Sequence, residues 1–389
     1  MNVLRCSWDS FAQILQKCLH NYAVYRLNQA TYNFWQCMQR HRLESSLSLL
    51  SQLPKKGASM SKRVFFNQTG PADVLEIVDW QEPSPQAGEI QVKVHAIGLN
   101  RAEIMYRNGQ YVIDPVFPAK LGYEASGEVV ALGENVAGFH LGDRVAVIPA
   151  FMFTEYGTYG EVVNLPASAV VKMPDNQSWT EAAATWMQFT TAYGALIEYA
   201  GLKEGDFVIL NAASSSVGMA AIQIANMVGA VPIAVSRTSS KARQLFDGGA
   251  KYVIATSEEN LKERILEITD GKGARVAFDP VGGAGATAII EALSFEGLFY
   301  QYGALSPDPI QVPVMDLLGK HLTLRGYELF EITADDGKLA RAKAFISKGL
   351  ASGALKPVIA KEFDFSQVQE AHRFMEKGTQ VGKIVLTVK

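Results

Sequence analysis

The sequence predicts an α/β protein that combines an irregular β domain with a doubly wound parallel sheet. From about Gly205, apolar runs rich in β-branched residues alternate with amphipathic segments, which is typical of a parallel sheet covered on both faces. Between Lys62 and about Pro174, short alternating runs are separated by turn residues, which favours a barrel-like β domain. A length of 389 residues also exceeds what one hydrophobic core usually serves. We therefore expect two domains.

The first 59 residues differ from the rest of the chain. They contain seven of the 36 basic residues, two of the 39 acidic residues and all three cysteines, Cys6, Cys18 and Cys37. We interpret residues 1–59 as an appended extension outside the fold, with a mitochondrial presequence as the alternative. The remaining 29 basic and 37 acidic residues give a net charge of −8, which argues against a nucleic-acid partner. No run approaches the roughly 20 apolar residues of a membrane span, so we expect a cytoplasmic protein, or a mitochondrial one if the extension is a presequence.

The expected elements follow in order along the chain. The β domain should contain strands within residues 89–100, 125–136, 142–149 and 159–173. The parallel sheet should use strands within 207–212, 231–237, 251–255, 274–280 and 297–303, with helices from about Ser216 and over 239–249, 259–269 and 285–294. After about Arg325 come helices over 336–353 and 366–378 and a closing strand at 382–389. We expect this last segment to return to the β domain, giving domains of 60–185 with 326–389, and of 186–325.

The loop after the first parallel strand has the layout of a dinucleotide-binding turn. A G-x-G-x-x-G register finds Ala213, Ser215 and Gly218, so two of the three glycines are missing. The turn needs little side-chain bulk near a pyrophosphate, and small residues meet that need. We therefore predict that the cofactor contacts the following loop residues: Ala213, Ser214, Ser215, Ser216, Val217 and Gly218. The alternative is that the turn only packs a helix on a strand.

The tip of the next strand indicates which dinucleotide binds. An NAD-preferring fold places an acid there to bind the ribose hydroxyls, but VPIAVSRTSSK offers Ser236, Arg237 and Lys241 and no acid. A guanidinium and an ammonium suit a 2′-phosphate, so we predict NADPH as the cofactor. The alternative is that these are ordinary solvated surface charges.

Taken together, several stretches resemble the medium-chain dehydrogenase/reductase superfamily over essentially all of residues 60–389. They are GLNRAEIMYRNGQY, LGYEASGEVVALGENV, GDRV, the TAY of residues 191–193, GDFVILNAASSSVG and ARVAFDPVGG. The resemblance implies a GroES-like β-barrel domain completed by the C-terminal segment, an inserted Rossmann domain, and an active-site cleft between them.

Alcohol dehydrogenases of this superfamily hold a catalytic zinc through a cysteine and a histidine whose positions here read Asn100 and Tyr123. Neither is a competent zinc ligand in that role, and the four-cysteine structural zinc loop is absent. Four histidines of the body are scattered singly, so we interpret them as structural or surface residues: His95, His140, His321 and His372. We therefore predict no metal.

The remaining features resemble the zinc-free branch of quinone reductases and enoyl or alkenal reductases. The resemblance assigns Tyr111 as the hydrogen-bond donor or acid, Asn100 as a positioning residue, and Thr191 as a neighbour of the nicotinamide. Packing at the domain edge and a helix-start hydroxyl are the alternatives for Tyr111 and Thr191. Strand-end position suggests further cofactor contacts from Tyr302, Gly303 and Ala304. We expect Glu124 to order the cleft, for instance by pairing with a nearby base. We interpret Asp279 as structural, with a cofactor contact as the alternative.

The predicted function is an NADPH-dependent reductase that transfers hydride to quinones or α,β-unsaturated carbonyl compounds without zinc. Two alternatives stay open: an alcohol dehydrogenase-type oxidoreductase, and an NADPH-binding structural or regulatory protein with little turnover. The expected partners are a small-molecule substrate and a second copy of the chain in a homodimer. The loops at 151–160 and 312–321 are candidates for lining the substrate pocket, and the preferred substrate cannot be read from the sequence.

Overall fold

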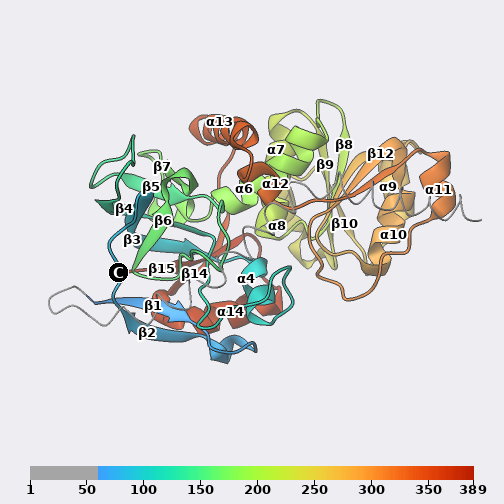
Figure 1. Cartoon of the computed structure of the whole chain (residues 1–389). Helices are drawn as coiled ribbons and strands as arrows, with labels where there is room; N and C mark the ends of the chain where they lie inside the picture. The colour runs from blue at the N-terminus through green and yellow to red at the C-terminus, as the bar shows by residue number, and fades with distance from the viewer. Residues whose placement is uncertain (1–59) are drawn as a thin grey trace, which may run out of the picture. The chain divides into compact units, whose positions relative to one another are not determined.

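The computed structural model describes residues 60–389, and the expectations for residues 1–59 lie outside the described residues (Figure 1). A six-stranded sheet has the order β10-β9-β8-β11-β12-β13, and every neighbouring pair is parallel. The chain runs outward from β8 to β10, crosses back to β11 and runs outward to β13. The strands are β8 (Phe207–Leu210), β9 (Val231–Ser236), β10 (Tyr252–Ala255), β11 (Ala274–Asp279), β12 (Leu293–Gln301) and β13 (Thr323–Gly326). The predicted α/β fold class is confirmed.

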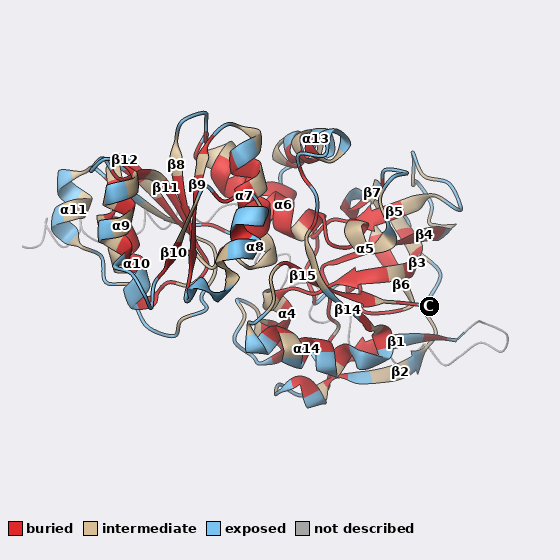
Figure 2. Ribbon diagram, turned by 180° about the vertical axis from the view of Figure 1, so that it is seen from behind, coloured by how far each residue is buried: buried red, intermediate tan, exposed pale blue. Residues whose placement is uncertain are grey.

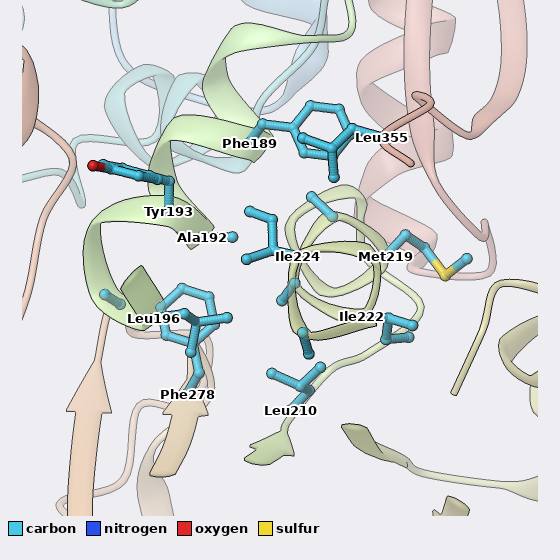
Figure 3. Packing of buried hydrophobic residues seen from close by; sticks show 14 of the residues in the cluster. Phe189, Ala192, Tyr193, Leu196, Leu210, Met219, Ile222, Ile224, Phe278 and Leu355 are labelled. Atoms are coloured by element: carbon cyan, nitrogen blue, oxygen red, sulfur yellow. The ribbon is translucent and has the colours of Figure 1, made fainter. Parts of the chain in front are cut away.

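Both faces of this sheet are buried because successive side chains of a strand point in opposite directions. Val208 and Leu210 of β8 pack in one hydrophobic cluster, whereas Ile209 between them packs in another. In Figure 3, Phe189 and Ala192 lie beside Ile224 above the strand residues Leu210 and Phe278. The helices around this sheet are α6 (Trp186–Tyr193) with a π-helical continuation (Gly194–Tyr199), α7 (Ser216–Met227), α8 (Ala242–Asp247), α9 (Leu261–Ile268), α10 (Gly283–Glu291) and α11 (Val314–Gly319).

A second sheet of seven strands is built mainly from the first half of the chain. Its order is β14-β15-β3-β4-β5-β7, with β6 paired to β3. Its inner side chains form a separate core, seen as continuous buried ribbon in Figure 2. The strands are β3 (Glu89–Gly98), β4 (Glu124–Leu132), β5 (Arg144–Val147), β6 (Val162–Pro166), β7 (Val170–Lys172), β14 (Ile359–Asp364) and β15 (Lys383–Thr387), and a separate antiparallel pair is β1 (Ser61–Phe65) with β2 (Glu76–Trp80).

The C-terminal segment joins this second sheet. Val385 of β15 pairs antiparallel with Gly98 of β3, and β14 pairs parallel with β15. The helices of this part are α4 (Arg101–Arg107), α5 (Trp179–Ala182), α12 (Phe330–Thr333), α13 (Asp336–Ser352) and α14 (Val368–Lys377), with single 3-10 turns at Ala72–Val74, Ala167–Ala169 and Phe365–Gln367, and one after β9 at Ser239–Lys241. β3 therefore pairs with β15 from the C-terminal segment as well as with β4 and β6.

One expected helix is too long. The pattern predicted a helix over residues 285–294, but α10 ends at Glu291 and Leu293 already pairs with Ala274 of β11. Hydrogen bonding to the neighbouring strand outweighs the local helical pattern here. No helix within residues 60–389 has the combination of length and apolar character that crossing a membrane requires.

Candidate functional site

The turn between β8 and α7 is shaped by close backbone packing. Ser215 caps the helix, since its hydroxyl accepts a hydrogen bond from the Gly218 N–H at 3.0 Å. A Cβ at Gly218 would lie 2.5 Å from the Ala213 carbonyl oxygen, so only glycine fits there. The first-turn amides of a helix lack intrahelical acceptors, and they face outward where a phosphate can bind. This turn lies beside the point where the strand order reverses, which suits a dinucleotide pyrophosphate.

Two cations lie next to this turn, at the tip of β9. The Lys241 ammonium donates to the Ser214 hydroxyl at 3.2 Å and to the Gly378 and Gln380 carbonyls at 3.0 Å each. Burial, followed by the neighbouring Arg237 charge, lowers the pKa of Lys241. Arg237 itself is exposed to solvent. The structure therefore brings Lys241 to the predicted phosphate loop, and Arg237 lies close enough to Lys241 to affect its pKa.

The other predicted cofactor contacts have mixed surroundings. Ser236 is buried at the end of β9 and donates to the Thr238 carbonyl at 2.8 Å, whereas Thr191 donates to the Met187 carbonyl at 2.5 Å within α6. The Tyr302 ring stacks on Phe278 with a centroid distance of 3.8 Å.

Tyr302 also reaches the phosphate loop. Burial raises the pKa of Tyr302, and a hydrogen bond with Ser215 opposes that rise. A Cβ at Gly303 would lie 2.8 Å from the Pro280 carbonyl oxygen, and Ala304 is exposed. Ser216 and Val217 form the first turn of α7. These residues gather near the carboxyl ends of β8, β9 and β12.

Asp279 at the end of β11 is held by its neighbours. It is fully buried and accepts hydrogen bonds from the Asn211 amide at 2.9 Å and from the Val281 and Gly282 N–H groups at 2.7 and 3.2 Å. These contacts support the structural interpretation of Asp279.

Asn100 lies at the start of α4, in the second sheet's domain. Its side-chain amide donates to the Gly98 carbonyl at 3.2 Å and to Glu103 at 3.3 Å, and its carbonyl oxygen accepts from Lys383 at 2.6 Å. Both polar atoms of the side chain therefore have protein partners. This arrangement suits a residue that holds its surroundings in place.

Glu124 forms a buried ion pair with Lys383, and the two side chains are 0% and 1% exposed. The other Glu124 oxygen accepts the Met187 N–H at 3.0 Å. Met187 belongs to α6, so the carboxylate links the second sheet to the start of that helix. The prediction that Glu124 pairs with a nearby base is confirmed.

Glu103 lies at the centre of a buried hydrogen-bonded network. Its carboxylate accepts from the Tyr159 hydroxyl at 2.6 Å, the Asn100 N–H at 2.8 Å, and the Tyr123 N–H and Asn100 side chain at 3.3 Å each. Burial raises the pKa of Glu103 to about 7, although the donors from Tyr159 and Asn100 and the charge of Lys383 lower it. All four of these groups donate to Glu103 and none accepts from it, which favours the ionised form of the carboxylate because that form has only acceptors.

The network continues to the protein surface through His372. Arg107 has only donors, so its contact with His372 Nδ1 at 3.0 Å makes that nitrogen the acceptor. The other ring nitrogen then donates to the Tyr159 oxygen at 3.1 Å. Burial and the Arg107 charge lower the pKa of His372 to about 3, which keeps the ring neutral. The network ends in an ion pair of Arg107 with Glu376, and the structural interpretation of His372 is confirmed.

Tyr111 lies beside an aromatic cluster. Its ring centroid is 5.9 Å from that of Phe153 and 6.4 Å from that of Tyr106, and the side chain is half-buried. Burial raises the pKa of Tyr111, the Tyr123 hydroxyl lowers it, and the charges of Glu328 and Glu103 raise it. The hydroxyl therefore stays protonated near neutral pH and can donate a hydrogen bond.

Tyr123 occupies the centre of the same aromatic cluster. Its ring stacks on that of Phe153 with a centroid distance of 3.8 Å, and its centroid lies 5.6 Å from that of Phe330 in α12. The side chain is fully buried, yet its hydroxyl has no hydrogen-bond partner within residues 60–389. Phe151 and Phe153 belong to the loop at 151–160, which the sequence suggested as a lining of the substrate pocket. The ring centroids of Phe151 and Tyr123 are 6.0 Å apart. In the described part of the chain, no group of three or more His, Cys, Asp or Glu side chains is placed to hold a metal ion.

The phosphate loop contacts the C-terminal segment of the second sheet's domain through main-chain atoms. The Gly382 N–H donates to the Ser214 carbonyl at 2.9 Å, and Ser215 and Gly382 form an isolated parallel bridge. Asn100 and Tyr111 lie on the second sheet's side of this contact. The sequence interpretation missed Lys383, Tyr159 and segment 378–382. A single lysine in the otherwise apolar strand KIVLT was the available signal for Lys383.

Comparison with known proteins agrees with this geometry. The family described as "Alcohol dehydrogenase GroES-like domain" matches residues 86–175, and the family described as "Zinc-binding dehydrogenase" matches residues 216–341. The chain is similar to the quinone oxidoreductase of Salmonella typhimurium, with 31% identity over 336 residues, covering 84% of this chain and 99% of the relative.

Solved structures show the same relation. The Escherichia coli quinone oxidoreductase complexed with NADPH has a TM-score of 0.78 and 31% identity, covering 84% of this chain and 99% of that one. An NAD-dependent alcohol dehydrogenase has the same TM-score, with 28% identity and coverage of 84% and 100%. The chain therefore belongs to the quinone oxidoreductase branch of the medium-chain dehydrogenase/reductase superfamily.

Proposed function

We propose that the protein is an NADPH-dependent reductase of quinones or α,β-unsaturated carbonyl compounds that works without zinc. The observation that carries the proposal is the half-buried Tyr111 hydroxyl, held in an aromatic cluster that also contains Tyr123 and Phe153. Aromatic surroundings favour a flat, apolar acceptor, and a protonated hydroxyl can stabilise negative charge on the acceptor's oxygen. A cluster of this kind with a hydroxyl donor suits conjugated carbonyl compounds.

The cofactor side of the proposal rests on the tip of β9. Arg237 and Lys241 would hold the 2′-phosphate of NADPH, and the turn from Ala213 to Gly218 would hold the pyrophosphate. The strand and tip from Val231 to Lys241 contain no acid to bind a free ribose hydroxyl. Thr191 and residues 302–304 would lie along the nicotinamide half.

The chemistry divides between cofactor and protein. When bound, NADPH supplies a hydride to the electron-poor carbon of the acceptor. In an enone, hydride addition to the β carbon shifts the C=C π pair into a new Cα=C bond, and the C=O π pair moves onto the oxygen to give an enolate. Tyr111 donates a hydrogen bond to that oxygen, and a proton from Tyr111 or water completes the reduction. The buried network around Asn100 fixes the start of α4, which precedes Tyr111 in the chain.

The test is oxidation of NADPH and of NADH, followed with a panel of quinones and enones. We expect kcat/KM to favour NADPH, and Arg237→Gln to raise the KM for NADPH roughly 10- to 100-fold, since a charge-assisted hydrogen bond contributes about 1.5–3 kcal/mol. The KM for NADH is the internal control and should not change. Clear NADH preference by the wild-type protein would overturn the cofactor assignment.

A second candidate function is alcohol oxidation, favoured by the similarity to an NAD-dependent alcohol dehydrogenase. Alcohol oxidation needs a Lewis acid or a strong base at the hydroxyl, and Asn100 and Tyr123 supply neither. Incubation with NADP⁺ or NAD⁺ and a panel of alcohols, with and without added zinc, separates the two functions. A protein that binds NADPH but turns over no acceptor would support the structural or regulatory alternative.

We further propose a homodimer formed through the edge of the parallel sheet. β13 is the last strand of that sheet, and the neighbouring α11 exposes Val314, Met315 and Leu318. A second copy could cover this apolar face and the open strand edge. Light scattering of Met315→Glu, compared with the wild type, tests this arrangement: loss of the dimer supports it. The cytoplasmic location stays a prediction from the sequence.

A further inference from the structure

The Tyr123 hydroxyl is a buried polar group without a protein partner. Within the described residues, no acceptor or donor lies at hydrogen-bond geometry to it, and the whole side chain is 0% exposed. The rings of Phe151, Phe153 and Phe330 around it offer no polar atom. Folded proteins rarely leave such a group unsatisfied, because burial removes its hydrogen bonds to water.

Tyr111 packs against the same Phe153 ring as Tyr123, with ring-centroid distances of 5.9 Å for Tyr111 and 3.8 Å for Tyr123. The two hydroxyls lie close enough to shift each other's pKa, although their geometry falls short of a hydrogen bond. Burial is the main cause of the raised pKa of both groups. The mutual effect lowers the pKa of Tyr111 and raises that of Tyr123, which is the pattern of Tyr123 as donor and Tyr111 as acceptor.

We propose that Tyr123 is a positioning residue for the reductase reaction: its hydroxyl donates to the Tyr111 oxygen and so directs the Tyr111 O–H toward the carbonyl oxygen of a conjugated substrate. The inference rests on the function proposed above. Tyr111 is half-buried and can reach a substrate, whereas Tyr123 lies fully behind it. Catalytic hydrogen bonds are often long without substrate and shorten in the complex, so the hydroxyl gap fits this role.

The geometry also explains why a tyrosine suits this position. The stack on Phe153 fixes the ring, which leaves the hydroxyl with little rotational freedom. Donation by Tyr123 leaves Tyr111 only one productive direction for its own proton, namely outward to the substrate oxygen. Charge that develops on that oxygen is then stabilised through two hydroxyls in series.

A double-mutant cycle tests the coupling with the best quinone or enone and NADPH. Tyr111→Phe should lower kcat on the order of 100-fold. Tyr123→Phe keeps the ring stack and should lower kcat about 10-fold with KM nearly unchanged. The double variant should be no slower than Tyr111→Phe alone, because Tyr123 acts only through Tyr111. Additive losses, or a Tyr123→Phe variant with full kcat, would overturn the proposal.

Tyr106 supplies a matched control. It is also fully buried, packs against Phe153 at 4.7 Å and has a hydroxyl without a hydrogen-bond partner in the part of the chain described. Its pKa, raised to about 12 by burial, responds to the Val116 backbone and not to Tyr111. Tyr106→Phe should therefore leave kcat and KM unchanged. An equal loss in both Phe variants would mean that any hydroxyl in the cluster matters, which also overturns the proposal.

A second measurement needs no substrate. 3-Chlorotyrosine placed at position 111 ionises with an absorbance change distinct from that of ordinary tyrosine, so its pKa can be measured in the full chain. Tyr123→Phe should raise that pKa, because the donor to the phenolate is lost. An unchanged pKa would overturn the coupling. If none of the quinones or enones supports NADPH oxidation by the wild-type protein, the proposed function fails. The titration still decides whether the two hydroxyls interact.

Discussion

Two groups of buried polar residues, one around Asn100 and one around Tyr123, differ in how well their hydrogen-bonding groups are satisfied. The side chains of Asn100, Glu103 and Lys383 all have protein hydrogen-bond partners. Around Tyr123, the rings are as tightly packed but the hydroxyl has none. The satisfied group holds the fold in place, whereas the unsatisfied hydroxyl has hydrogen-bonding capacity left for chemistry.

The difference has an energetic basis. A buried polar group that keeps its partners is close to neutral for stability, but removing one partner leaves the other unpaired at a cost of about 1–3 kcal/mol, and more when it is charged. Removal of a hydroxyl that already lacks a partner breaks no hydrogen bond and should change the free energy of unfolding less. Variants of the first group should therefore change mainly stability, and variants of the second mainly kcat.

Lys383→Met should have the largest effect. It leaves the fully buried Glu124 carboxylate without its cation and the Asn100 carbonyl oxygen without a donor. We expect a loss of about 3–5 kcal/mol in the free energy of unfolding, measured by urea titration. The double variant Lys383→Met with Glu124→Gln removes both charges and should recover much of this loss. Equal instability of the single and double variants would show that the charge pair is not the cause.

Tyr111→Phe tests the other side of the comparison. Loss of its hydrogen bond to the substrate oxygen should raise the activation barrier by about 2.7 kcal/mol, the equivalent of roughly 100-fold in kcat. The free energy of unfolding should stay close to that of the wild type, since the Tyr111 hydroxyl is not part of the satisfied network. A variant with normal kcat but poor stability would reverse the distinction between the two groups.

A smaller effect should appear in the pH dependence of stability. The pKa of His372 in the folded protein, about 3, lies below its ordinary value of 6.5. The stabilisation from the neutral ring is therefore fully present above pH 6.5 and is lost as the pH falls toward 3, because only the unfolded state takes up the proton in this range. At pH 5, about 1.5 pH units below the ordinary pKa, the free energy of unfolding is lower by about 2 kcal/mol, at about 1.4 kcal/mol per pH unit. His372→Gln keeps one acceptor and one donor but does not titrate. The difference in unfolding free energy between pH 7 and pH 5 should shift by about that amount in the variant.

Glu103 changes the pH dependence of stability in the opposite direction. The His372→Gln variant is therefore needed to separate the contribution of His372 from that of Glu103. Its pKa is raised to about 7, and a carboxyl with a raised pKa gives stability that is present below its ordinary pKa and lost as the pH rises through 7. Acidification of the wild type therefore combines two opposing contributions. An identical pH dependence in wild type and His372→Gln would contradict a neutral buried His372.

Local sequence signals were enough for the phosphate loop. The strand, the small-residue turn and the helix from Ser216 are adjacent in the chain, and Gly218 is fixed by contact with Ala213 only five residues away. The two cations at the next strand tip follow from the same βαβ geometry. Neighbouring carboxyl ends of parallel strands bring these residues together whatever the rest of the protein does.

The substrate side could not be read in the same way. Lys383 pairs with Glu124 across 259 residues, Arg107 meets His372 across 265, and Tyr159 reaches His372 across 213. Each of these residues looks ordinary in its own segment. The sequence interpretation named Asn100 and Tyr111 through family resemblance, but it did not see that Asn100 is already fully hydrogen-bonded or that Tyr123 is not.

The sequence by itself determined the α/β fold class, the phosphate loop and the cations beside it, because these depend on strand and helix periodicity and on contacts between near neighbours in the chain. Only the tertiary structure decided which buried polar groups are satisfied. That property depends on partners brought together by β15 and α14, hundreds of residues from α4, and on the aromatic rings that close around Tyr123. Hydrogen-bond satisfaction is a property of three-dimensional neighbours, so it could not be predicted from the separate segments of the sequence.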